Sequence, residues 1–103
     1  MSDFETKPDA STDGTNDDLK RRKQMLYRSN HRGIKEMDII LGGYADAHIM
    51  SMKQDVLNEF EHIMSQPDRD LLTWFVGEIE VPANIKSPLF DAILEFTLQK
   101  QRA

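Results

Sequence analysis

The sequence predicts an all-α protein, a compact five-helix bundle with a disordered acidic N-terminal tail. Apolar residues recur at steps of three and four from residue 18 almost to the C-terminus, no alternating strand pattern of useful length appears, and capping residues and prolines separate the helical stretches. A chain of 103 residues is long enough for one domain and too short for two. We therefore expect one helical domain over residues 18–103.

Residues 1–17 are expected to form the disordered tail. They are polar and acidic, they contain Pro8 and Gly14, and Phe4 is their only large apolar side chain. Such a segment cannot bury enough apolar surface to offset the conformational entropy that ordering would cost.

The first two helices are expected over residues 18–31 and 34–48. The first has apolar residues on one side and bases on the other, and the second has an apolar stripe. Gly42 and Gly43 interrupt the second helix, and each costs about 1 kcal/mol relative to alanine. We therefore expect that helix to bend or end there. The residues of its stripe are Ile34, Met37, Leu41, Ala45 and His48.

Three further amphipathic helices are expected over residues 52–64, 69–79 and 88–101. Asp68 is in position to cap the fourth helix, because an aspartate oxygen accepts hydrogen bonds from free N–H groups at a helix start. Pro88 suits the first position of the last helix, where its missing N–H removes no hydrogen bond.

The net charge of −5 conceals an uneven distribution along the chain. Residues 1–18 carry six acids and one base, residues 19–35 carry seven bases and no acid, and residues 36–98 carry twelve acids and three bases. A molecule with one basic end can be oriented by the electric field of a partner. The distribution therefore favours a binding function without naming the partner.

Several function classes lack the residues that they need. The absence of cysteine excludes disulfides, thiol catalysis and cysteine-ligated zinc, and no Gly-rich phosphate loop or apolar run of membrane-spanning length appears. Glu59 and His62 form one Glu-x-x-His pair, whereas ferritin-like di-iron sites use two. The first residues lack the basic and apolar stretches of a secretory signal, and they are acidic rather than Arg-rich as in a mitochondrial presequence. We expect a cytoplasmic protein that is not an enzyme.

Asp68, Asp70 and Trp74 form a D-x-D-L-x-x-W stretch with two interpretations. In the structural one, Asp68 caps a helix, Asp70 interacts with the positive end of the helix dipole, and Trp74 packs on the bundle. In the other, these residues contact a partner directly.

Arg32, Gly33 and Glu36 lie between the first two helices, and local structure does not explain all three. Gly33 could be a left-handed glycine at the end of the first helix. That interpretation leaves the charges unexplained, because Arg32 and Glu36 could either pair across the turn or face a partner. A glycine between them leaves bare backbone that another protein can approach closely.

Together these motifs resemble the succinate dehydrogenase assembly factor family, the group of bacterial SdhE and mitochondrial assembly factor 2. The R-G-x-x-E motif of residues 32–36 continues into Met37 and Asp38, and the D-x-D-L-x-x-W motif of residues 68–74 follows after roughly thirty residues. The order of the motifs, their interval and the chain length all agree with the family. The resemblance covers about residues 19–100.

The resemblance implies a five-helix fold and a role in covalent flavinylation. Family members bind the flavoprotein subunit of succinate dehydrogenase, in some bacteria that of fumarate reductase, and promote attachment of FAD to it. It implies a chain that binds no cofactor stably by itself and acts on the FAD of its partner. The candidate partner-binding residues are Arg28, Arg32, Gly33, Glu36, Asp38, Asp68, Asp70 and Trp74.

Two other functions compete with this one. An interaction module of another kind, such as a toxin-neutralising protein, would also present a charged surface. A nucleic-acid binder would use the basic run Lys20–Lys23, but the acidic remainder of the domain would repel phosphates.

Overall fold

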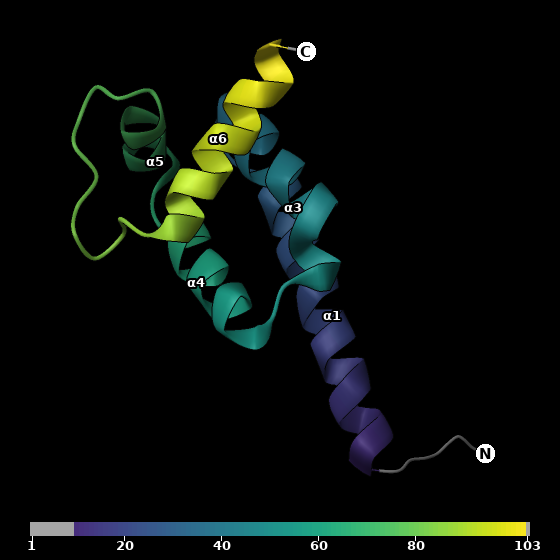
Figure 1. Ribbon diagram of the computed structural model, residues 1–103. Helices are drawn as coiled ribbons and strands as arrows, with labels where there is room; N and C mark the ends of the chain where they lie inside the picture. Colours follow the sequence, from purple (N-terminus) through teal and green to yellow (C-terminus); the bar gives the residue numbers. More distant parts are fainter. Residues whose placement is uncertain (1–9, 103) are drawn as a thin grey trace.

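The computed structural model describes residues 10–102, with side chains over residues 16–101 (Figure 1). Helices make up the regular structure and no strand occurs within this range, which confirms the predicted all-α class and its five helices. The second helix is a composite of several short segments. The elements are α1 (Ala10–Asn30), α2 (Lys35–Met37), η1 (Asp38–Gly42), α3 (Gly43–His48), η2 (Ile49–Ser51), α4 (Gln54–Met64), α5 (Asp68–Phe75) and α6 (Pro88–Arg102).

Helix α1 begins at Ala10, eight residues before its expected start at residue 18. Residues 10–17 of the expected tail are therefore helical, whereas residues 1–9 lie outside the described residues. Once a helix is nucleated, each added residue gains a hydrogen bond at little further cost, so a helix can extend past its packed part. The N-terminal part of α1 projects beyond the other helices (Figure 1).

The second helix runs through the glycine pair instead of ending there. One π-helical turn, η1, precedes α3, and both Gly42 and Gly43 have helical dihedral angles. A Cβ atom on Gly42 would lie 2.9 Å from Asn30 Cγ and 3.1 Å from the carbonyl oxygen of Ser29. Gly42 therefore allows the close approach of η1 to α1, which sequence periodicity alone does not reveal.

The two glycines should respond oppositely to alanine. Gly42→Ala should lower the free energy of unfolding by about 1–2 kcal/mol, because overpacking against α1 outweighs the gain in helix propensity. Gly43→Ala should raise it by up to about 1 kcal/mol, because a Cβ there meets no atom within 4 Å. Urea denaturation of both variants checks this pair, and the same sign in both would contradict it.

Helix α5 ends at Phe75, although the apolar pattern predicted a helix to residue 79. Gly77 has a left-handed φ of 84°. Its N–H donates to the Trp74 carbonyl at 3.3 Å, and the Glu78 N–H donates to the Thr73 carbonyl at 2.9 Å. This pair of bonds is a Schellman motif, which terminates the helix.

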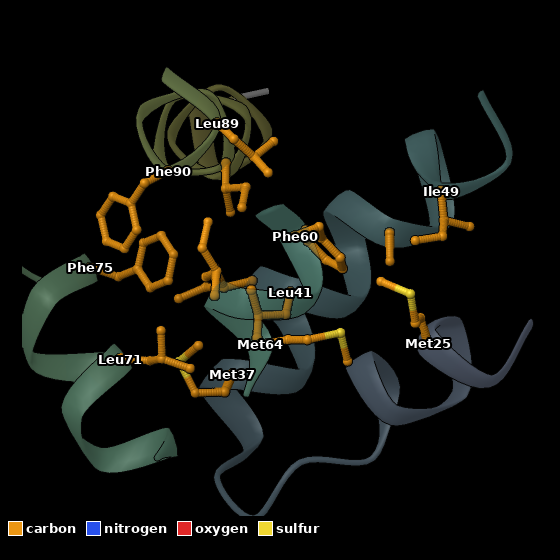
Figure 2. Packing of buried hydrophobic residues seen from close by; sticks show 14 of the residues in the cluster. Met25, Met37, Leu41, Ile49, Phe60, Met64, Leu71, Phe75, Leu89 and Phe90 are labelled. Carbon is orange, nitrogen blue, oxygen red and sulfur yellow. The ribbon is translucent and has the colours of Figure 1, made fainter. Parts of the chain in front are cut away.

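The core collects apolar side chains from all five helices into one cluster (Figure 2). Phe75 of α5 and Phe90 of α6 stack with their ring centroids 4.3 Å apart. Burying a side chain of this size contributes roughly 1.5–3 kcal/mol, so the core fixes how α1, α4 and α5 meet around the connection between α1 and α2. The most deeply buried large side chains include Met25, Met37, Leu41, Leu57, Phe60, Ile63, Met64, Leu71, Phe90 and Ile93.

Candidate functional site: the corner between α1 and α2

Residues 31–34 join α1 to α2 and carry the start of the R-G-x-x-E motif. Ile34, just before α2, is extended with φ −121° and ψ 128°. Among the described glycines, only Gly77 has a positive φ, so the interpretation of Gly33 as a left-handed helix-ending glycine is wrong. The chain turns here without a left-handed residue.

Arg32 points into the bundle and joins the corner to two other helices. Its Nε donates to Asp68 Oδ1 at 2.6 Å, and its Nη1 and Nη2 donate to the carbonyl oxygens of Met64 and Gln66 at 2.6 and 3.1 Å. Met64 ends α4 and Asp68 begins α5. The guanidinium therefore satisfies the Met64 carbonyl at the end of α4 and the Gln66 carbonyl in the loop after it, and it pairs with a carboxylate at the start of α5.

Asp68 holds the corner with both of its oxygens. Its Oδ2 accepts the backbone N–H of Gly33 at 2.6 Å, while its Oδ1 binds Arg32. The side chains of Arg32 and Asp68 are only 11% and 17% exposed. Charge-assisted bonds of this length in a largely buried setting are strong. We call these two residues the Arg32–Asp68 clamp.

The clamp corrects two sequence predictions. Asp68 does not cap α5, because the residue before that helix is Pro67 and no side-chain cap bond forms. Arg32 does not pair with Glu36 and does not direct its guanidinium towards solvent. Of the two charges expected to flank an open glycine, Glu36 is exposed and Arg32 is engaged internally.

The outer face of the corner is formed by Gly33, Lys35, Glu36 and Ile39, which we call the corner surface. All four residues are exposed, and Ile39 is 59% exposed. Glu36 makes no hydrogen bond or ion pair with any residue whose side chain is described, whereas half-buried Asp38 accepts the backbone N–H of Arg32 at 2.5 Å. The surface combines bare backbone, an unengaged carboxylate and an apolar side chain. Sequence reasoning missed Lys35 and Ile39, although both lie within or next to the motif.

The other predicted site residues lie on α1 and α5. Arg28 is exposed, with Nη1 3.7 Å from Glu61 Oε2. Asp70 is exposed in the first turn of α5, and half-buried Trp74 packs against the core. Packing of Trp74 agrees with its structural interpretation, and partner contact by these three residues stays a prediction.

The basic run in α1 is only partly available to a ligand. Arg21 donates to Asn58 and Glu61 at 2.8 and 2.7 Å, and Arg22 donates to Asp18 and to the carbonyl oxygen of Ile49 at 2.8 and 2.6 Å. The hydrogen bond from Arg22 lowers the pKa of the Asp18 carboxyl below its ordinary value. Two of the four bases therefore fasten α1 to the bundle.

Within the described residues, no three His, Asp or Glu side chains come together as metal ligands would. No helix in the described part of the chain is both long and apolar enough to span a membrane.

The model of one protein family, described as the flavinator of succinate dehydrogenase, matches residues 23–97. The match spans the corner, the clamp and the core of the bundle. The chain belongs to this family. Family membership agrees with the resemblance inferred from the R-G-x-x-E and D-x-D-L-x-x-W motifs.

The relatives with curated names are named as FAD or succinate dehydrogenase assembly factors. The chain is 33% identical over 75 residues to an FAD assembly factor SdhE from Acetobacter pasteurianus, an alignment that covers 73% of this chain and 69% of the relative. It is 31% identical over 74 residues to the mitochondrial succinate dehydrogenase assembly factor 2 of Dictyostelium discoideum, covering 72% and 52%. A protein of that second name from Schizosaccharomyces pombe is 35% identical, covering 78% and 66%. The chain thus spans about half to two thirds of these relatives' length.

Proposed function

We propose that this chain binds the flavoprotein subunit of succinate dehydrogenase and promotes the covalent attachment of FAD to it. Membership of a family described as the flavinator of succinate dehydrogenase supports this function. The observation that carries it is the corner surface, where Glu36 and the glycine backbone at Gly33 are both exposed. Such a surface is suited to close contact with another folded protein.

The clamp makes this surface rigid before the partner arrives. Because Asp68 binds both Arg32 and the Gly33 N–H, the corner has little conformational freedom left to lose on docking. The binding free energy can then stabilise the one conformer of the flavoprotein that is competent for attachment. When bound by the flavoprotein, FAD would supply the group that becomes covalently attached, and this chain would order that site without holding the cofactor stably itself.

Deletion of the gene tests this function. The flavoprotein band of succinate dehydrogenase should lose its in-gel flavin fluorescence, and a plasmid that encodes the chain should restore it. The fumarate reductase flavoprotein, where the organism has one, should be scored in the same gel as a second client. An unchanged fluorescent succinate dehydrogenase band in the deletion strain would refute the proposal.

A further inference from the structure

A groove of about 530 Å³ lies beside the corner surface, between the second helix and α6. Ile39 of η1, Gly43 of α3 and Phe96 of α6 contribute its apolar part, and Lys35 and Lys100 lie at its charged part. Helix α6 packs against η1 and α3, so both walls are fixed by the core. The groove is continuous with the corner surface, because Lys35 and Ile39 belong to both.

Gly43 is the informative residue in this groove. It is helical, with φ −61° and ψ −44°, and glycine is a poor helix former at such a position. A Cβ there would meet no atom within 4 Å, whereas Gly42 is required by the close approach of α1. No packing contact therefore explains Gly43. The missing side chain instead keeps this part of the groove open.

Two lysines and two aspartates line the groove, and they differ in whether they already have a partner inside the chain. Asp38 accepts the Arg32 backbone N–H, and Asp46 accepts the Asn30 side-chain amide at 3.2 Å, so internal donors engage both acids. Lys35 and Lys100 form no ion pair with any residue whose side chain is described, and Lys100 Nζ lies 5.4 Å from the Phe96 ring centroid. A carboxylate on an incoming segment would thus find two cations without displacing an internal bond.

We infer that this groove receives an apolar side chain of the flavoprotein, carried next to a carboxylate that Lys35 and Lys100 bind. This inference rests on the proposed function and extends its contact area from the corner surface to α6. Interface hot spots are typically large side chains buried in well-packed pockets of the partner. The groove gives the anchor a pre-formed site between Ile39 and Phe96.

Filling the groove tests the inference. Gly43→Phe places a ring where the anchor would sit, and its Cβ enters open space, so the melting temperature should stay at or above that of the wild type. Its affinity for the purified flavoprotein subunit of succinate dehydrogenase should fall at least about tenfold. Ala83→Phe adds the same ring on an exposed loop residue outside the groove and should bind like the wild type.

A second variant tests the charge without altering the shape of the groove. Lys100→Glu, at a groove residue outside the corner surface, should also weaken binding at least about tenfold, and this loss should shrink as salt is raised. If both groove variants bind with wild-type affinity and Glu36→Lys loses binding, the groove is not a docking site. The proposed function would still stand in that case. Failure of the wild-type chain to bind the flavoprotein would instead refute the proposed function.

Discussion

Asp68→Ala should lower the free energy of unfolding by about 3 kcal/mol, the largest stability loss expected for any single charged residue discussed above. The change leaves the guanidinium of Arg32 largely buried without its counter-charge, and it removes the acceptor of the Gly33 N–H. Breaking one side of a buried ion pair typically costs about 3–5 kcal/mol, and the two carbonyls that still bind Arg32 place this case at the lower end. Urea denaturation followed by circular dichroism measures the loss.

An exposed ion pair of the same chain provides the control. Lys86 and Asp91 approach to 2.8 Å, but their side chains are 57% and 56% exposed. Lys86→Ala should therefore cost less than about 1 kcal/mol. Comparable losses in Lys86→Ala and Asp68→Ala would show that burial of the clamp adds nothing to its strength.

The clamp should also be needed for function at temperatures where Asp68→Ala is still folded. Without Asp68, the Gly33 N–H loses its partner and the corner is no longer tied to α5. A looser corner must be ordered on docking, so affinity for the flavoprotein should fall even though Asp68 itself is mostly buried.

The sequence predicted the helices well because each buries one stripe of apolar residues. Its errors at the corner have a physical cause. Arg32 and Glu36 are four residues apart, but α2 begins at Lys35, so they do not share a helix and the i,i+4 geometry does not apply. The true partner, Asp68, is 36 residues away in sequence. Its position depends on how α5 packs, and no local pattern encodes that.

The glycines show which features of the structure the sequence could reveal. Gly77 is a recognisable stop signal inside an apolar pattern, and its left-handed conformation ends α5 as glycine commonly does. Gly42 and Gly43 look alike in sequence and differ only in their surroundings, since one faces α1 and the other faces the groove. A role of the corner in partner binding stays a prediction, and the division between internal clamp and outer surface required coordinates.

Glu36→Lys should abolish most flavoprotein binding while leaving the fold intact. Glu36 is exposed and makes no hydrogen bond or ion pair with any residue whose side chain is described, so its replacement should change the free energy of unfolding by no more than about 0.5 kcal/mol. Reversal of a charge inside an interface should cost about 2 kcal/mol or more of binding free energy, which is about thirtyfold in Kd. Glu36 is a better position for this test than Gly33, where a Cβ would lie 3.2 Å from Asp68 Oδ2 and press on the clamp.

The most direct measurement is the Kd of the purified succinate dehydrogenase flavoprotein for the wild-type chain, for Glu36→Lys and for Glu80→Lys. Glu80→Lys makes the same change in net charge on an exposed loop residue. We expect Glu80→Lys to bind like the wild type and Glu36→Lys to bind about thirtyfold more weakly or worse. Equal affinities for all three proteins would contradict the assignment of the corner surface as the docking site.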